Sequence, residues 1–296
     1  MGGKNKGRLA KFLLQFTDIK EGQRVTHTGL DGGRWHIPQS EVKKLYKCIN
    51  YDFSKKIPLP LLVEKMGDIL PFMIDLDFKY TDKIENKAYT NNLTKRLSEY
   101  IWMVINENIE LDETQNEVLV MEKSKPYPVK VDKNKKPGKY KSKDGVHLCF
   151  PKIVIDKLKF RFLVDELLDM EIINNIFEEE SEITPSNISE NTILDSSISG
   201  WQPYLCSKKD EEPYLVTKVY MMYDGNAVEL NEAEKEVNYT PCKMMNKISL
   251  SKDLKDTLVY KECFTNEFKK NSTGLYSLNS VNSMSSLSSL SSTTSD

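Results

Sequence analysis

The chain has 296 residues, 39% of them hydrophobic, and a formal net charge of −2 at pH 7. This length suits one large domain or two small ones with a real core. No run of 18 apolar residues and no apolar leader occurs, so we expect neither a membrane span nor a secretory signal. Five scattered cysteines without a Cys-x-x-Cys pair, and only three histidines, argue against a disulfide framework and a zinc or His-rich centre. The sequence therefore predicts a protein of a reducing intracellular compartment.

The first half of the chain reads as alternating strands and helices. A loop rich in glycine and threonine covers 22–37, and a helix is predicted to start after Ser40. Residues 70–78 form the clearest strand, because the run is apolar apart from two aspartates. Apolar residues recur with a helical period over 92–106, and 117–122 reads as a second strand.

The second half continues with a third strand at 146–150, which we expect to stop at Pro151, and a helix at 156–170. A hairpin is predicted around Asp224 and Gly225. For the domains we expect an N-terminal flank over 1–29, one catalytic domain over 30–265 that contains a basic loop (123–143) and a polar surface excursion (178–191), and a disordered Ser-rich tail or linker over 266–296.

Two aspartates interrupt the clearest strand. Asp75 and Asp77 are two residues apart, so in a strand both side chains point to the same face. Like charges held together are costly unless a cation shares them, and Mg²⁺ or Mn²⁺ prefers such oxygen ligands. The competing interpretation is a strand end whose aspartates cap a turn.

Two further residues could join this pair. His147 lies in the third strand after Gly145, where it could contact a phosphate; alternatively it is a core histidine. Asp195 follows the apolar pair 193–194 and could be a third metal carboxylate, or a turn residue.

Positive charge gathers in two places. Ser207, Lys208 and Lys209 could neutralise a triphosphate, or form an ordinary solvated run, while Trp201 and Tyr204 nearby are expected to be core residues. The basic loop could hold a nucleic-acid backbone or be only a solvated loop. Its candidate contacts are Lys130, Lys133, Lys135, Lys136, Lys139, Lys141 and Lys143.

The order of these motifs resembles a known family. The chain runs Ile-Asp-Leu-Asp-Phe at 74–78, Lys-Asp-Gly-Val-His-Leu-Cys-Phe-Pro at 143–151, Ile-Leu-Asp at 193–195 and Trp-Gln-Pro-Tyr-Leu-Cys-Ser-Lys-Lys at 201–209. This resembles the primase domain of the primase–helicases of large nucleocytoplasmic DNA viruses, within the archaeo-eukaryotic primase superfamily. The similarity covers roughly 30–230. Relatives usually carry Gly-Ser where this chain has Leu205 and Cys206.

The resemblance implies an α/β fold in which an α/β unit and an RRM-like sheet unit enclose the active site. It implies that Asp75, Asp77 and Asp195 hold two Mg²⁺ or Mn²⁺ ions, and that His147 and Lys208 bind nucleotide phosphates. The implied partners are single-stranded DNA, nucleoside triphosphates and a helicase domain on the same or another chain. The implied activity is primer synthesis, at viral replication sites in the host cytoplasm.

Two alternatives remain open on the residues alone. Clustered acids on strands serve a metal-dependent nuclease equally well. The altered segment at Leu205 and Cys206 also fits a non-catalytic DNA-binding or assembly module with a degenerate primase fold.

Overall fold

A computed structural model describes residues 7–29, 32–59, 61–129, 138–168, 171–188, 192–195, 200–208 and 211–250. Its helices are α1 (Arg8–Leu13), the 3-10 helix η1 (Leu14–Phe16), α2 (Gln39–Ser54), α3 (Asn91–Asn108), α4 (Lys157–Leu168), α5 (Glu171–Glu180), α6 (Glu232–Asn238) and α7 (Pro241–Ile248). Its strands are β1 (His27–Gly29), β2 (Arg34–Trp35), β3 (Leu62–Lys65), β4 (Ile69–Tyr80), β5 (Glu117–Glu122), β6 (Tyr127–Pro128), β7 (Ser142–Asp156), β8 (Gly200–Trp201), β9 (Leu215–Tyr223) and β10 (Asn226–Glu229).

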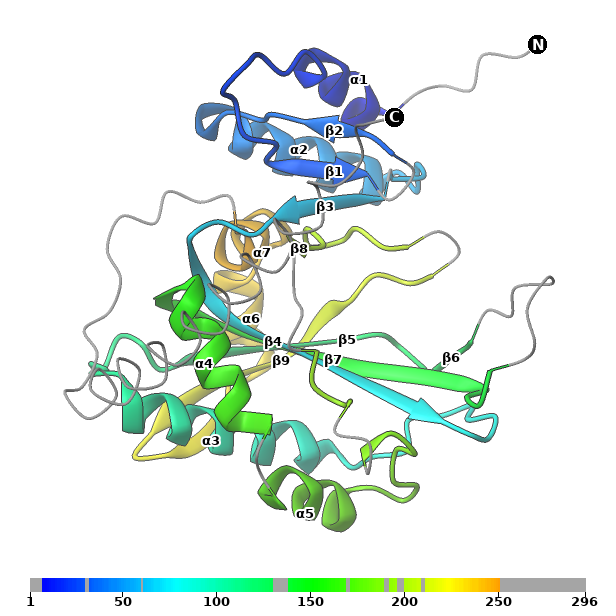
Figure 1. The fold of residues 1–296 in the computed structure, drawn as a ribbon, viewed down its shortest axis with the longest axis vertical. Helices are drawn as coiled ribbons and strands as arrows, with labels where there is room; N and C mark the ends of the chain where they lie inside the picture. The colour runs from blue at the N-terminus through cyan, green and yellow to red at the C-terminus, as the bar shows by residue number, and fades with distance from the viewer. Residues whose placement is uncertain are drawn as a thin grey trace, which may run out of the picture.

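Four strands form a small antiparallel sheet in the order β2-β1-β3-β8. Together with α1 and α2 this sheet makes the N-terminal layer, at the top of Figure 1. Trp35 and Leu62 from the strands pack with Leu45 and Ile49 from α2 in a core of its own. Part of the expected flank over 1–29 therefore belongs to the fold, because it supplies α1 and the internal strand β1.

The main sheet has six strands in the order β10-β9-β5-β7-β4, with β6 also paired to β7. The strands predicted at 70–78, 117–122 and 146–150 are confirmed as parts of β4, β5 and β7. The expectation that β7 stops at Pro151 was wrong, because the strand continues to Asp156. The register with β4 jumps next to this proline, from Pro71↔Val154 to Phe72↔Phe150. Proline is tolerated at such a bulge, where a ladder hydrogen bond is not required.

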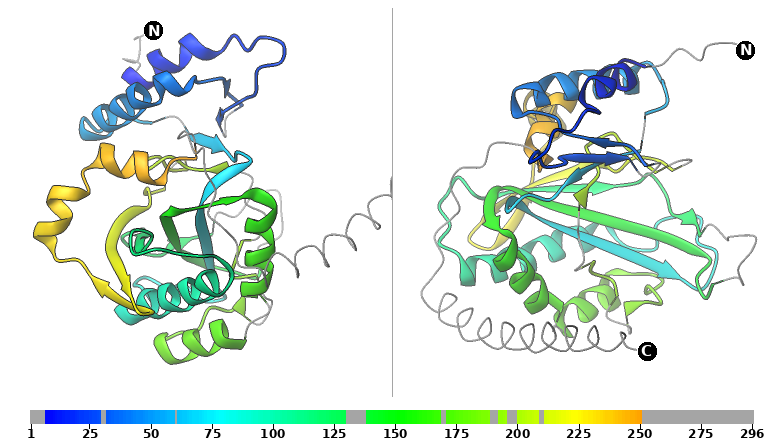
Figure 2. Two further views of the ribbon diagram at one scale, coloured as in Figure 1. Left: turned by 90° about the vertical axis from the view of Figure 1, so that its left-hand side faces the viewer. Right: turned by 45° about the horizontal axis from the view of Figure 1, so that its top comes forward.

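The two faces of the main sheet have different neighbours. Helices α3, α4 and α5 lie on the face away from the N-terminal layer, as Figures 1 and 2 show. Leu76 and Leu148 from the sheet pack with Leu97 and Ile101 of α3 in the main core. The opposite face of β4 and β7 is thereby left for the N-terminal layer and the space beneath it.

The hairpin predicted around Asp224 and Gly225 is confirmed. Strands β9 and β10 pair antiparallel with Tyr223 opposite Asn226, so only these two residues form the turn. Both have positive φ, 48° and 82°, as a type I′ turn requires. In the part of the chain that the structure describes, no helix is long and apolar enough to cross a membrane.

Candidate functional site

Strand β4 presents its two aspartates to the space under the N-terminal layer. Its burial alternates, with Leu76 and Phe78 in the main core and Asp75 and Asp77 half-buried on the other face. In the antiparallel pairing with β7, Asp75 lies opposite His147 and Asp77 lies opposite Gly145. The two motifs, with Asp75 and His147 separated by 72 positions in the sequence, are therefore neighbours across one strand pair.

The third acid reaches the same row from the other side of β4. The backbone N–H of Asp195 donates to the carbonyl of Asp75 at 3.0 Å, and that of Asp77 donates to the carbonyl of Ile193 at 2.7 Å. Leu76 and Leu194 form an antiparallel bridge between them. Asp195 is thus directly opposite Asp75, and directly opposed side chains share a face. His147, Asp75 and Asp195 make one row across three chain segments.

A buried asparagine holds this third segment in place. The side-chain oxygen of Asn187 accepts from the N–H of Lys79, and its nitrogen donates to the carbonyls of Asp77 and Thr192. Asn187 is fully buried, so its part of the polar excursion predicted over 178–191 is not a surface feature. The sequence offered no signal for it beyond one asparagine in a polar stretch.

His147 is both packed and accessible to the site. Its ring stacks on Tyr214 at a centroid distance of 3.6 Å and contacts Trp201 at 4.6 Å. Its Nε2 lies 3.2 Å from Oδ1 of Asp75. A Cβ on Gly145 would come within 2.8 Å of the Tyr214 hydroxyl, so a side chain there would displace this aromatic support. Aromatic packing therefore fixes the imidazole beside the carboxylates.

These side chains line a cavity of about 280 Å³ between the N-terminal layer and the main sheet. The main sheet and the segments beside it contribute both charged and aromatic groups, and the N-terminal layer closes the cavity from above. The lining residues are Val63, Asp75, Asp77, Lys123, Tyr127, His147, Asp195, Gly200, Trp201, Gln202, Lys208, Glu211 and Tyr214. The cavity therefore lies between two sheet units, where the resemblance led us to expect the active site.

One buried lysine in this cavity went unrecognised in the sequence, where it was only part of the basic loop. Lys123 is 5% exposed, and its Nζ lies 2.8 Å from Glu211 Oε2 and 3.7 Å from the ring centre of Tyr127. The N–H of Glu211 donates to the carbonyl of Lys208 at 3.0 Å. One turn thus brings an acid and a lysine to the cavity together.

The two aspartates of β4 differ in their acidity. Burial alone would raise the pKa of Asp75, but His147 and Lys208 outweigh it and hold that pKa below the ordinary value. The pKa of Asp77 is raised, by burial first and by the charge of Asp75 second. The mutual repulsion is the feature that a bound cation would relieve.

The oxygen donors of this site are of the kind that a divalent cation prefers. The described side chains are not, however, already arranged as a metal site. Oδ1 of Asp75 is buried and lies 3.2 Å from Nε2 of His147. Oδ2 of Asp77 lies 4.0 Å from Nζ of Lys143. Among the described residues, no three His, Cys, Asp or Glu side chains form a group arranged to hold one ion. Asp75 and Asp77 are the pair that could hold a cation, with Asp195 beside them.

The remaining predicted site residues fall in different places. Lys208 lines the cavity, whereas Ser207 is half-buried outside its lining. Nζ of Lys143 lies 4.0 Å from Oδ2 of Asp77, but Lys143 is not part of the cavity lining, and Lys139 and Lys141 are exposed. The residues predicted here but outside the described parts of the chain are Lys130, Lys133, Lys135, Lys136 and Lys209.

In the altered segment before Lys208, the backbone adopts a conformation that glycine favours. Leu205 has φ 73°, in the left-handed region that glycine favours and bulky residues rarely adopt. The N–H of Cys206 donates to the carbonyl of Pro203 at 2.9 Å, which makes Leu205 the third residue of the turn. Its side chain is buried in the core of the N-terminal layer. A turn therefore forms at this position although leucine stands where relatives usually carry glycine. As expected, Trp201 is buried, and Tyr204 is half-buried, its hydroxyl accepting from the N–H of Val216.

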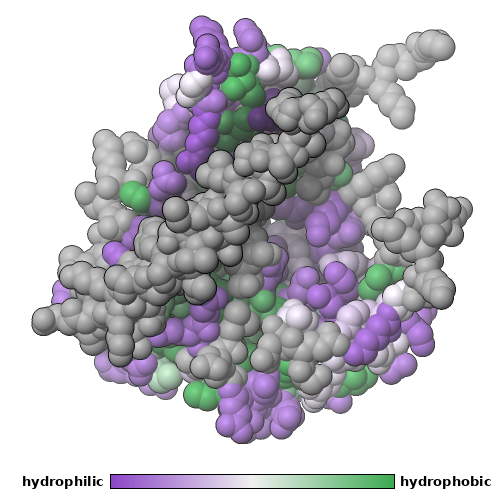
Figure 3. Space-filling model, in the orientation of Figure 1, coloured by the Kyte–Doolittle hydropathy of each residue, from purple (hydrophilic) through white to green (hydrophobic). Residues whose placement is uncertain are grey.

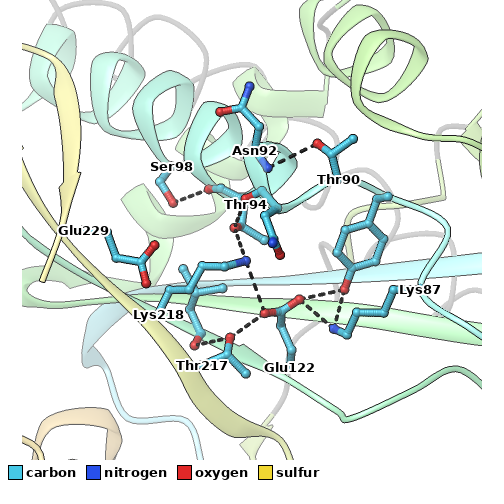
Figure 4. Close-up of polar contacts among 12 residues, drawn as sticks. Lys87, Thr90, Asn92, Thr94, Ser98, Glu122, Thr217, Lys218 and Glu229 are labelled. Carbon is cyan, nitrogen blue, oxygen red and sulfur yellow. Dashed lines mark hydrogen bonds and ion pairs between the residues drawn. The ribbon is translucent and has the colours of Figure 1, made fainter. Parts of the chain in front are cut away.

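A polar network on the opposite face of the sheet supports the site (Figure 4). Glu122 accepts from Lys87 at 2.6 Å and from Thr217, and lies 3.6 Å from Lys218. Burial would raise the pKa of Glu122, but Lys87 leads the groups that lower it to about 2. Because neighbouring residues in a strand point to opposite faces, fixing Glu122 behind the sheet helps to direct Lys123 into the cavity.

Comparison with known proteins identifies a family for this chain. Residues 26–220 match the model of the C962R protein N-terminal AEP domain, where AEP denotes archaeo-eukaryotic primase. A protein of Invertebrate iridescent virus 6, named "Putative helicase 184R", is 23% identical over 231 residues. That match covers 71% of this chain and 22% of the viral protein, so the chain spans about a fifth of this relative. The family match covers the whole N-terminal sheet, the main sheet as far as Tyr220 in β9, and all four motifs, and the resemblance drawn from motif order is confirmed. The chain belongs to the C962R-type N-terminal AEP domain family of primase-like proteins.

Proposed function

We propose that this domain synthesises primers on single-stranded DNA by template-directed, metal-dependent nucleotidyl transfer. The observation that carries the proposal is the row of Asp195, Asp75 and His147, with Asp77 beside it, at a cavity that also contains Lys123 and Lys208. Carboxylates for cations and lysines for phosphates are the two kinds of group that phosphoryl transfer requires.

The chain's own residues have separate tasks in this proposal. Asp75, Asp77 and Asp195 would hold Mg²⁺ or Mn²⁺, which would supply charge neutralisation at the triphosphate and a more acidic primer 3′-hydroxyl. Lys208 and His147 would bind the phosphate oxygens of the incoming nucleotide. Base pairing with the template would select the nucleotide, so protein contacts to DNA would mostly be to backbone.

The relative from the iridescent virus is named a helicase and is much longer than this chain. We therefore also propose that the domain works with a helicase domain, on the same or another chain. Priming and unwinding would then be coupled at one replication fork.

The test is primer synthesis on single-stranded DNA with labelled nucleotides and Mg²⁺ or Mn²⁺. Wild-type protein is compared with the double variant Asp75→Asn, Asp77→Asn. The matched control is Asp82→Asn, Asp224→Asn, which removes two exposed aspartates that are not part of the cavity lining. Products from wild type and control, and none from the first variant, are expected.

Two other results would overturn the proposal in favour of a different function. Shortening of the DNA by wild type, lost in the Asp75, Asp77 variant, would identify a nuclease. No product from any protein, with DNA binding intact in all, would identify a non-catalytic binding module.

A further inference from the structure

Positive charge is concentrated at the start of the chain. Residues 1–66 contain 13 Lys and Arg against 6 Asp and Glu, whereas the remainder contains 29 against 38. Two of those six acids are buried and occupied: Asp52 accepts from the N–H groups of Arg8 and Leu9, and Glu64 accepts from Ser249 and Leu250. The described part of the N-terminal layer therefore carries more positive than negative charge, and in Figure 3 hydrophilic residues cover much of it, with hydrophobic residues between them.

The sheet of this layer has one covered and one open face. His27, Trp35, Leu62 and Glu64 are buried on the side of α1 and α2. Residues alternating with them, Thr28, Arg34, Val63 and Lys65, are half-buried or exposed. Because strand side chains alternate between faces, these four share the open face.

Strand register connects the open face with the cavity. Arg34 lies opposite Thr28, and Thr28 lies opposite Val63, so the three form one row across β2, β1 and β3. Val63 and Gln202 both line the cavity. A row across three strands spans about 10 Å, the rise of roughly three stacked nucleotides.

Three cations lie in or near this row. Arg34 is exposed at the outer edge of the sheet. Lys65 is two residues from Val63 on the same face, opposite Gly200 of the cavity wall. Arg24 donates to the carbonyl of Met66 and lies 3.9 Å from Asp68, a pair so exposed that it offsets little of the charge.

We propose that the open face of the N-terminal sheet is a binding track for single-stranded nucleic acid, which leads the strand into the cavity. Arg24, Arg34 and Lys65 contact its phosphates. The assignment rests on the proposed function for the nature of the strand, and adds a surface separate from the basic loop of 123–143. Sequence-independent contacts of this kind release counterions, so they are recognised by their salt dependence.

The experiment measures fluorescence anisotropy of a labelled oligothymidine, without nucleotides or metal, at several salt concentrations. The open-face variant is Arg24→Gln, Arg34→Gln, Lys65→Gln. The matched control, Lys43→Gln, Lys47→Gln, Lys55→Gln, removes three exposed charges from α2 and its C-terminal end, on the covered side of the same sheet. Thermal unfolding of both variants checks that the layer stays folded.

The open-face variant is expected to bind more than tenfold more weakly, with the slope of log K against log salt reduced by about 2. The control is expected to stay within about twofold, because its charges lie off the track. Equal weakening in both variants, or none in either, would overturn the track. A further result would also overturn the track: polyglutamate, an acidic peptide, binds the open-face variant more weakly than wild type, whereas oligothymidine binds both equally. The partner of the open face would then be a protein.

Failure of the track and failure of the proposed function give different results. If wild type makes no primers but the open-face variant alone loses oligothymidine, the track stands and the catalytic assignment falls. If wild type makes primers and both variants bind equally, only the track falls.

Discussion

Nζ of Lys123 lies 2.8 Å from Oε2 of Glu211, and both residues line the same cavity as the aspartates of β4. A second acid of the same segment, Glu212, accepts from the hydroxyl and N–H of Ser124. The turn that carries Lys208 is therefore fastened to the end of β5 by two neighbouring acids. A triphosphate entering the cavity would compete with Glu211 for the same ammonium group.

This competition gives opposite predictions for the two partners. Lys123→Met should raise the KM for nucleotide by about tenfold or more, because a charge-assisted hydrogen bond to phosphate is lost. Glu211→Gln should lower the KM a few-fold, because it removes a negative charge from the phosphate path. Steady-state primer extension at varied nucleotide concentration measures both. Glu212→Gln is the control, since its side chain contacts Ser124 and not the cavity; a raised KM in Glu211→Gln would show that Glu211 instead positions Lys123.

Asn187→Ala should lower both stability and activity. The substitution leaves the N–H of Lys79 and the carbonyls of Asp77 and Thr192 without their buried partner. Each of these three groups costs about 1–3 kcal/mol when left unpaired, so we expect the free energy of unfolding to fall by about 3 kcal/mol or more. Urea denaturation measures this loss, and Asn226→Ala, in the exposed hairpin, should change it little. At a temperature where both variants remain folded, primer synthesis should fall more than DNA binding, because Asp195 loses its support.

Asp144 predicts an unusual pH dependence of stability. It is fully buried, and burial raises its pKa from 3.8 to about 6. Its contribution to stability is therefore greatest below the unfolded pKa and is lost as pH rises through about 6. Two pKa units correspond to about 3 kcal/mol. Asp144→Asn should raise the free energy of unfolding at pH 8 and change it little at pH 4; equal effects at both values would contradict this account.

Leu205→Gly separates backbone strain from side-chain packing. Glycine would relieve the cost of φ 73°, about 1–2 kcal/mol, but remove a buried leucine worth about 2–5 kcal/mol. We expect a net loss of stability in thermal unfolding, with the KM for nucleotide unchanged at low temperature because the turn keeps its shape. A more stable variant would show that strain exceeds packing at this position.

The site was predictable where strand periodicity determined it. Asp75 and Asp77 share a face because they are two residues apart, and an apolar strand surrounds them. The same periodicity does not give register, so the meeting of Asp75 with His147 was inferred from motif order. Asn187 and Lys123 were missed because their importance comes from long-range contacts that no local pattern encodes. Part of the flank over 1–29 likewise proved to be structure, because its strand finds partners only in the folded sheet.

The last strand of the N-terminal sheet has a consequence for how the domain assembles. Glu64 of β3 pairs with Trp201 of β8, 137 positions later in the chain. At a synthesis rate of 5–20 residues per second, the time between the synthesis of β3 and that of β8 is therefore on the order of ten seconds. Pairings between such distant segments are slow to form. The cavity, which needs Trp201 and Tyr214, should thus be among the last features to appear, and an incomplete nascent chain should have no working site.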